Sequence, residues 1–309
     1  MPTKAVAPSP PLAAAVAKLR RALVIRAKSL LITIYGDAIA PRTQSVWLGS
    51  LIALMAPFGV SPRLVRTSAF RLAADDWFDA SRVGRRSFYA LSQTGMLRTQ
   101  HADRRIYEFN LPAWDGHWTV VLLDPGLRAS ERQHLARELL WESFGQLAPN
   151  VFAHPHVDHL SLREILQSTG LAGNAAVLRC EGIETYSSAP LQSIMHTTFA
   201  LHRVEHAWKQ FIARFAALGD NLQRLTPAEA FYARTLLIHE YRRVLLRDPN
   251  LPEAFLPAHW PGVRARQLCE ALYRGLLGPS ENHLMQQVTT LDGRLAATPS
   301  TILQRLARG

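Results

Sequence analysis

Three arginines and a threonine share one side of a predicted helix that begins after Ser61. Ser61-Pro62 is typical of an N-cap followed by proline at the first helical position, and helical periodicity continues over residues 61–77. One side of this helix is an apolar stripe of Val65, Ala69 and Leu72. The stripe should pack on a second predicted helix, at residues 47–56. The opposite side carries Arg63, Arg66, Thr67 and Arg71, with Phe70 among them. Arginine can pair with guanine and threonine with a base edge or a thymine methyl, so this side could read a DNA major groove.

Two short predicted strands follow, at residues 78–82 and 87–91, and the turn between them contains Gly84. The tip is basic, with Arg82, Arg85 and Arg86, and could lie along phosphates or enter a minor groove. Helix, turn, helix and hairpin is the order of a winged helix-turn-helix. Each piece has an ordinary alternative, since an arginine face is often only solvated and a Gly-Arg turn is often only a turn. Arg42, Thr43 and Gln44 precede the 47–56 helix, where phosphate contact and capping are equal interpretations.

The distribution of charge favours a polyanionic partner. The chain of 309 residues has a formal net charge of +11, and residues 1–110 hold 16 Lys/Arg against 6 Asp/Glu. The remaining residues hold 19 Lys/Arg and 18 Asp/Glu, so nearly all the excess positive charge belongs to the first third. A concentrated basic region is the electrostatic footprint of a nucleic-acid-binding domain. A basic tail that serves only solubility is the alternative.

The rest of the chain forms two further blocks. Strand, helix, strand, helix and strand alternate over residues 118–180, which predicts a ferredoxin-like α+β domain although one strand is not apparent. From about residue 190 the pattern is helical, at residues 192–218, 227–247 and 261–277, without convincing strands. We therefore expect an α+β protein with a partly disordered leader (1–27), a winged helix-turn-helix (28–110), a ferredoxin-like domain (111–188) and a helical domain (189–309).

Long segments of the chain resemble the PaaX family of transcriptional regulators. The resemblance is carried by SLLITIYGDAIAPR (29–42), VWLGSLIALMAPFGVSPRLVRTSAFRLAADDW (46–77), GRRSFYALSQTG (84–95), RRIYEFNLPAWDGHWTVVLLD (104–124) and LIHEYRRVLLRDPNLPEAFLPAHWPGVRA (237–265). It implies the same three domains and a homodimer that binds double-stranded operator DNA with inverted repeats. The DNA-reading role passes by position to Arg63, Arg66, Thr67 and Arg71.

The resemblance also implies release from the operator by an aryl-acyl-CoA, such as phenylacetyl-CoA for the family's named member. Arg242 and Arg243 could meet the phosphates of an acyl-CoA, and Tyr241 or Trp260 could line an aryl pocket. Surface ion pairs and a rigid turn are the alternative interpretation of this segment. The expected function is a repressor of an aromatic-acid catabolic operon; a DNA-binding protein without a ligand is one alternative.

Enzymatic chemistry finds little support in the sequence. Phosphate-binding glycine loops and a nucleophile elbow are absent, and no cofactor is expected. The central block resembles small CRISPR nucleases, with Asp124 at the end of a strand, so a metal-dependent nuclease is the second alternative; one carboxylate does not make a two-metal site. The three histidines and the aspartate of His154–His159 could bind zinc, but a strand-to-helix turn is the simpler interpretation. Without a signal peptide or a membrane span, a cytoplasmic location is expected.

Overall fold

The computed structural model describes residues 14–42, 44–109, 113–181 and 191–300, together with Ile302 and Arg305. Its contacts divide the chain into two compact units. The first contains Met1–Phe109, Phe211–Tyr241 and Arg266–Gly309, and the second contains Asn110–Gln210 and Arg242–Ala265. The helical third of the chain therefore contributes to both units. The domain boundaries drawn from the sequence stay a prediction.

The N-terminal part of the first unit is helical. Its helices are α1 (Ala14–Ala22), α2 (Ala27–Ile34), α3 (Leu48–Met55), α4 (Pro62–Ala74) and α5 (Gln93–Ile106). A π-helical turn, Tyr35–Ile39, continues α2. Helix α1 ends at Ala22, and α2 begins at Ala27. Helix α5 was not predicted, because its first turn contains Gly95 and its apolar periodicity is weak.

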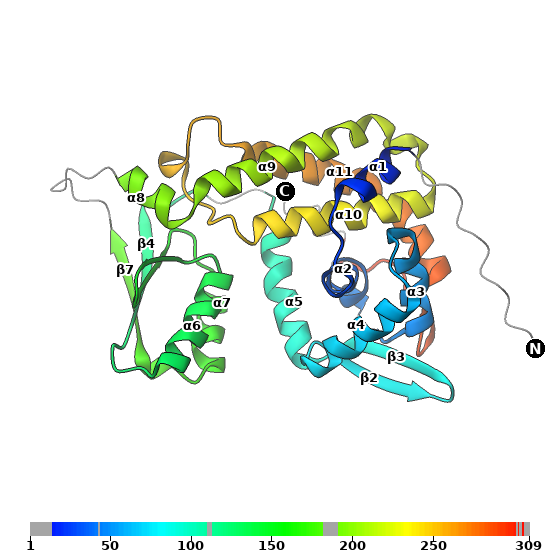
Figure 1. Cartoon of the computed structure of the whole chain (residues 1–309), viewed down its shortest axis with the longest axis horizontal. Coiled ribbons are helices and arrows are strands. Elements are labelled where there is room, and N and C mark those ends of the chain that lie inside the picture. The colour runs from blue at the N-terminus through cyan, green and yellow to red at the C-terminus, as the bar shows by residue number, and fades with distance from the viewer. Residues whose placement is uncertain are drawn as a thin grey trace, which may run out of the picture. The chain divides into compact units, whose positions relative to one another are not determined.

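A five-stranded antiparallel sheet completes the winged helix, and Figure 1 shows its hairpin of β2 (Phe78–Val83) and β3 (Arg86–Leu91) beside α4. Its order is β2-β3-β1-β8-β9, with β1 (Val46–Trp47), β2 (Phe78–Val83), β3 (Arg86–Leu91), β8 (Thr289–Thr290) and β9 (Gly293–Arg294). Strand β1 pairs with β3 on one side and with β8 on the other. The prediction that the chain has no strands after residue 190 was wrong, since β8 and β9 extend the N-terminal sheet. These strands are two residues long, too short to produce an alternating pattern in the sequence.

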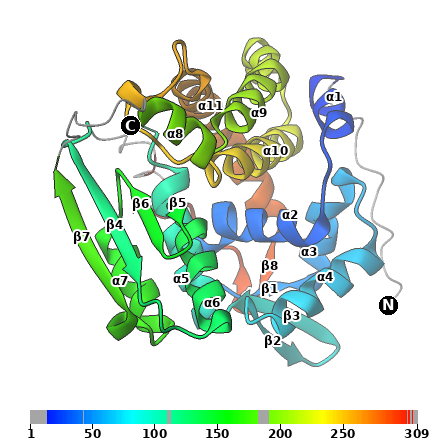
Figure 2. The ribbon, with the colours of Figure 1, turned by 60° about the vertical axis from the view of Figure 1, so that its left-hand side comes forward.

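The second unit contains a four-stranded antiparallel sheet of order β5-β6-β4-β7 (Figure 2). The strands are β4 (His117–Leu123), β5 (Gly145–Ala148), β6 (Val151–His154) and β7 (Ala175–Glu181), with helices α6 (Ala129–Trp141) and α7 (His159–Ser168) between them. The βαββαβ order with the first and third strands central is the ferredoxin-like topology, as predicted. The strand that the sequence did not reveal is β5, which follows a turn at Ser143 with a positive φ of 66°.

Two apolar layers enclose this sheet. On one face, Val121 and Leu123 pack with Leu135 of α6 and Leu162 of α7. On the other face, Trp118 packs in a second cluster with Met195, Leu201, Leu251 and Phe255. Both faces of the sheet are therefore buried in part, which explains the continuous apolar run of β4.

Four helices follow the ferredoxin-like domain: α8 (Leu191–Thr198), α9 (Leu201–Phe215), α10 (Pro227–Leu245) and α11 (Pro261–Gln287). The predicted helix over 192–218 is interrupted at Ala200, whose φ of 47° ends α8 before α9 begins. Helix α11 continues ten residues beyond the predicted end at Leu277, through Pro279. Among the described residues, no helix is long and apolar enough to cross a membrane.

Candidate nucleic-acid interface

Helix α4 begins with the capping that the sequence predicted. The Ser61 side chain accepts a hydrogen bond from the backbone N–H of Leu64 at 3.3 Å, and Pro62 occupies the first helical position. The turn before it passes through Gly59 with a φ of 78°, a left-handed conformation that glycine adopts without strain. Local sequence therefore determines where α4 begins and the conformation of the turn between α3 and α4.

One side of α4 is buried and holds the helix in place. Val65, Ala69 and Leu72 are fully buried, and Ser68 is 5% exposed. This side packs against both α2 and α3, whereas the sequence predicted α3 alone. Two supporting helices leave α4 little freedom to rotate about its axis. The orientation of its other side is therefore set by the core.

The outer side of α4 is basic and exposed. Arg63, Arg66 and Arg71 are exposed and form no ion pair with any residue that the structure describes. The Thr67 hydroxyl donates to the carbonyl oxygen of Arg63 at 3.0 Å. The hydroxyl proton is thus engaged, although the residue is exposed. Three guanidinium groups without internal partners can bind phosphates or base edges.

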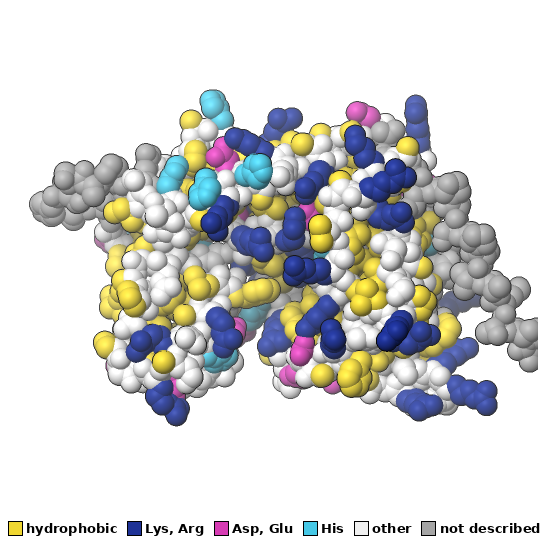
Figure 3. Space-filling view, viewed as in Figure 1, with side chains coloured by type: hydrophobic (Ala, Val, Ile, Leu, Met, Phe, Trp, Pro, Cys, Tyr) yellow, Lys and Arg dark blue, Asp and Glu magenta, His cyan; other side chains and the backbone are white. Residues whose placement is uncertain are grey.

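The β2–β3 hairpin places a second basic group beside this helix. Its strands pair from Phe78↔Leu91 to Val83↔Arg86, which leaves a two-residue turn at Gly84 and Arg85. Gly84 has a φ of 58°, as such turns require, and Arg82 Nε donates to the Gly84 carbonyl oxygen at 3.1 Å. Arg85 is fully available at the tip, with no described partner. In Figure 3, Lys and Arg side chains gather over the region of α4 and this hairpin.

Arg86 has a neighbour that the sequence did not reveal. Its guanidinium carbon lies 4.9 Å from the centre of the Trp47 ring. The Trp47 ring in turn lies so close to Gly49 that a Cβ there would be 2.4 Å from it. This cation–π stack fixes Arg86 against the start of α3. Strands β1 and β3 pair Trp47 with Phe88, and that register brings the two side chains together.

The structure contradicts the phosphate contact predicted for Arg42. Arg42 is 6% exposed, and its guanidinium donates to the Ala296 carbonyl oxygen at 3.0 Å and pairs with Glu281. The side chain is therefore occupied inside the protein. Thr43 lies outside the described residues, and the Gln44 side chain accepts from the backbone N–H of Ala296 at 3.0 Å. Arg42 and Gln44 therefore bind the C-terminal segment of the protein and are not available to a nucleic acid.

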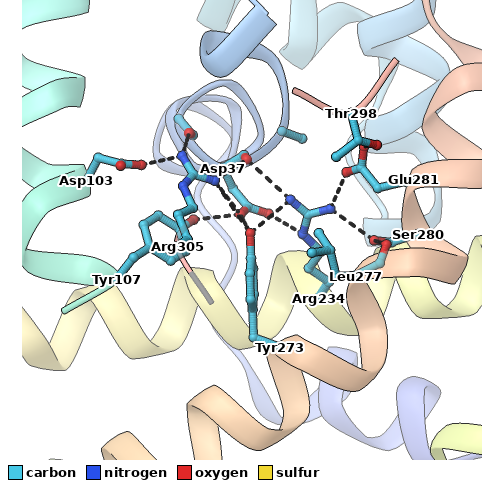
Figure 4. Close-up of polar contacts among 12 residues, drawn as sticks. Asp37, Asp103, Tyr107, Arg234, Tyr273, Leu277, Ser280, Glu281, Thr298 and Arg305 are labelled. Atoms are coloured by element: carbon cyan, nitrogen blue, oxygen red, sulfur yellow. Dashed lines mark hydrogen bonds and ion pairs between the residues drawn. The ribbon is translucent and has the colours of Figure 1, made fainter. Parts of the chain in front are cut away.

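A buried ionic network lies behind the winged helix (Figure 4). At its centre the Asp37 carboxylate accepts from the hydroxyls of Tyr107 at 2.6 Å and Tyr273 at 2.9 Å. Arg234 Nε lies 2.8 Å from the same carboxylate, and Arg305 donates to the Asp37 carbonyl oxygen at 2.7 Å. The network joins the π-helical turn to α5, α10, α11 and the C-terminal segment, all within the first unit.

The other half of the network surrounds Glu281. Its carboxylate accepts from Arg234 at 2.6 Å and from the Thr298 hydroxyl at 2.7 Å, in addition to its pair with Arg42. Arg305 also pairs with Asp103, and its guanidinium carbon lies 4.0 Å from the centre of the Tyr107 ring. Three arginines thus meet three carboxylates, so the cluster is close to neutral.

The carboxyls of this network remain charged although they are buried. Burial raises the pKa of Asp37, but the charges of Arg234 and Arg305 and the hydrogen bond from Tyr107 outweigh it and hold the pKa below its ordinary value. Burial likewise raises the pKa of Glu281. The charge of Arg234 and the hydrogen bond from Thr298 outweigh burial, so the pKa of Glu281 is also below its ordinary value. The available signal in the sequence was an acidic residue inside an otherwise apolar segment.

The predicted effector residues fall in different places. Tyr241 is fully buried in the first unit, where its ring lies 6.0 Å from Phe109 and 5.8 Å from Phe211. Arg242, Arg243 and Trp260 belong to the second unit, and Trp260 packs at the margin of its Trp118 cluster. The effector site therefore stays a prediction.

The two weaker candidates of the central domain have structural roles. Asp124 Oδ1 accepts from the backbone N–H of Gly126 at 2.8 Å in an exposed turn. His154 Nδ1 accepts from the N–H of His156 at 2.9 Å, and Asp158 caps α7 by accepting from Leu160. Among the described residues, no group of three or more histidine, cysteine or acidic side chains could hold a metal ion.

Comparison with known proteins places these elements in one family. Residues 26–95 match the description "PaaX-like protein", residues 111–193 match "PaaX protein central Cas2-like domain", and residues 199–286 match "PaaX-like protein C-terminal domain". The chain belongs to the PaaX family. It is 38% identical over 288 residues to the transcriptional repressor PaaX of Escherichia coli, covering 92% of this chain and 91% of that protein.

Among PaaX-family chains the α+β architecture seen here is the expected one: an N-terminal domain, a Cas2-like domain and a C-terminal helical domain. A solved structure, the uncharacterized protein Rv0674 from Mycobacterium tuberculosis, is 24% identical, with a TM-score of 0.44 over 74% of this chain and 88% of that one. That likeness is too weak to carry an argument.

Proposed function

We propose that this chain is a DNA-binding transcriptional repressor that reads its operator with the outer side of α4. The observation that carries the proposal is the exposed set Arg63, Arg66 and Arg71, which has no ion pair with the described residues. The similar protein from Escherichia coli is named a transcriptional repressor, which supports the same function here. Helix α4 enters the major groove, and its arginines and Thr67 contact base edges.

The β2–β3 hairpin binds the backbone of the same DNA. Arg85 at the tip and Arg82 beside it contact phosphates, which position the protein without carrying sequence information. Arg86, held by Trp47, follows the turn of the hairpin and contacts the phosphate nearest to α3. The buried side of α4 and the stacked Trp47 together keep both groups of arginines in a fixed relation.

The protein acts as a homodimer and responds to a ligand. Two copies place two α4 helices in successive major grooves, about 34 Å apart, and so read an inverted repeat. An aryl-acyl-CoA such as phenylacetyl-CoA binds the helical domain, with Arg242, Arg243 and Trp260 of the second unit as its contacts, and favours a conformation that leaves the operator. The regulated genes are those of an aromatic-acid catabolic operon. Membership of the PaaX family supports this proposal.

A gel-shift titration on DNA from upstream of the protein's own gene tests the function. The wild-type protein should bind this DNA at nanomolar concentrations and scrambled DNA far more weakly. The combined variant Arg63→Ala, Arg66→Ala and Arg71→Ala should lose the preference. Arg163→Ala, which removes one exposed charge from α7, is the control and should bind normally. Equal binding of both DNAs by the wild-type protein would contradict the proposal.

Addition of acyl-CoA thioesters to the same titration tests the ligand. An aryl-acetyl-CoA should dissociate the complex and raise the melting temperature of the free protein, since a ligand that binds the folded state stabilises it. Free CoA and acetyl-CoA are the matched controls. If no thioester changes either quantity, the protein is a DNA-binding protein without this class of ligand.

A further inference from the structure

Phe70 is an apolar side chain in the middle of the basic side of α4. It is 70% exposed, although phenylalanine is among the residues most often buried. It follows Arg66 by four residues and Arg63 by seven, so all three lie along one line of the helix surface. Thr67 and Arg71 lie on the neighbouring line. The phenyl ring is therefore surrounded by the residues that the proposed function assigns to DNA.

The fold does not need Phe70 in this position. The core of the winged helix is formed by the opposite side of α4, where Val65, Ala69 and Leu72 are fully buried. Phe70 makes no ring contact with any residue that the structure describes. A ring so exposed gains nothing in the free protein, and it gains free energy when a partner removes it from water.

The surrounding charges select the kind of partner. A second copy of the chain that packed on this side would bring Arg63, Arg66 and Arg71 against their own counterparts, and like charges repel across an interface. DNA neutralises these charges and releases its counterions. In a major groove, the apolar feature of a base edge is the C5 methyl group of thymine.

We propose that Phe70 contacts the C5 methyl group of one thymine in each operator half-site and makes the protein specific for thymine there. The inference rests on the proposed function and adds to it a contact that depends on apolar surface rather than on hydrogen bonds. Along the helix axis Phe70 lies about 10 Å from Arg63, which corresponds to about three base-pair steps. We therefore expect the thymine about three base pairs from the base that Arg63 contacts.

Operators in which single thymines are replaced by deoxyuridine test the contact, because uracil lacks only the methyl group. The wild-type protein should bind about fourfold more weakly for each half-site in which one particular thymine is replaced. Replacement of the other thymines should have no effect. The variant Phe70→Ala should bind the unmodified operator more weakly by a similar factor and should no longer distinguish thymine from uracil. Phe70→Leu, which retains an apolar side chain, should keep part of the discrimination.

Several results would overturn the inference while leaving the proposed function intact. One is specific binding by the wild-type protein that no uracil substitution weakens. Another is Phe70→Ala retaining the full sensitivity to uracil. A lower melting temperature or a changed oligomeric mass of Phe70→Ala would also overturn it, because Phe70 would then be a structural contact. A wild-type protein that shows no sequence preference at all would instead contradict the proposed function.

Discussion

Two sets of three arginines in the first unit have opposite environments. Arg63, Arg66 and Arg71 lie exposed on α4 without an ion pair among the described residues. The second set, Arg42, Arg234 and Arg305, is buried and paired with Asp37, Asp103 and Glu281. The difference shows that the net charge of a region overstates the number of its charged side chains that a partner can contact. Only the first set is available to a nucleic acid.

The buried set has a different use, which is to connect parts of the chain that are distant in sequence. Arg234 belongs to α10 and Arg305 to the C-terminal segment, and both bind the π-helical turn that follows α2. Strands β8 and β9, which also come from the C-terminal part of the chain, extend the winged-helix sheet. The winged-helix part is therefore built from segments at both ends of the sequence. A change in α10 or α11 acts directly on the support of α2, against which α4 packs.

Removal of Arg234 should have the largest effect of any change in this comparison. The variant Arg234→Met leaves the Asp37 and Glu281 carboxylates buried without their shared partner, and we expect a loss of about 3–5 kcal/mol in the free energy of unfolding. Urea denaturation of the full chain measures it. Arg224→Ala removes an exposed arginine from the same unit and should change stability by less than about 0.5 kcal/mol. Equal stability of the two variants would show that the network is not a structural element.

Acid should reduce the contribution of the buried ion pairs to the free energy of unfolding. The pKa values of Asp37 and Glu281 are lowered in the folded protein, so their contribution is fully present above the pKa of the unfolded chain, near 4, and is lost as the pH falls through the folded values. The contribution of these two carboxyls to the free energy of unfolding should be flat from pH 7 to 5 and should fall below pH 4, by at most about 1.4 kcal/mol per pH unit for each carboxyl.

Urea titrations at a series of pH values check this dependence. The exposed Asp220 offers a matched substitution, and Asp220→Asn should follow the wild-type curve. In Asp37→Asn, which is already less stable, the fall below pH 4 should be shallower. A fall of equal steepness in Asp37→Asn would mean that Asp37 does not carry the dependence.

The hairpin tip should give the smallest effect. Arg85→Ala removes one phosphate contact, so the slope of log affinity against log salt concentration should decrease by about 0.9. Operator and scrambled DNA should both be bound more weakly by the same factor. Fluorescence anisotropy at several salt concentrations measures both quantities, with Arg163→Ala as the control of equal charge. A loss confined to the operator would assign Arg85 to base recognition instead.

The sequence predicted those elements whose signals are local. The Ser61 cap, the apolar stripe of α4 and the turn at Gly84 each depend on residues within one or two turns of chain, and all three are present. The ferredoxin-like order was also readable, because its helices and strands are long enough to show their periods. The basic side of α4 could be predicted for the same reason, since helical spacing alone brings its residues together.

The remaining features depend on contacts between distant residues. Arg305 donates to Asp37 across 268 positions, and nothing near either residue indicates the other. Arg42 was interpreted as a phosphate contact or a cap because it precedes a predicted helix; its partner Glu281 lies 239 positions away. Strand β8 pairs with β1 over two residues only. Such contacts are produced by tertiary packing and leave no periodic pattern.

The ratio of operator affinity to scrambled-DNA affinity in Arg66→Ala tests the central claim most directly. Arg66 is exposed on α4 and has no partner among the described residues, so its removal should leave the melting temperature unchanged. Loss of an arginine that contacts a base should reduce the affinity ratio by about 5- to 150-fold at fixed salt. An unchanged ratio, with operator and scrambled DNA weakened alike or not at all, would contradict the claim that this side of α4 reads the operator.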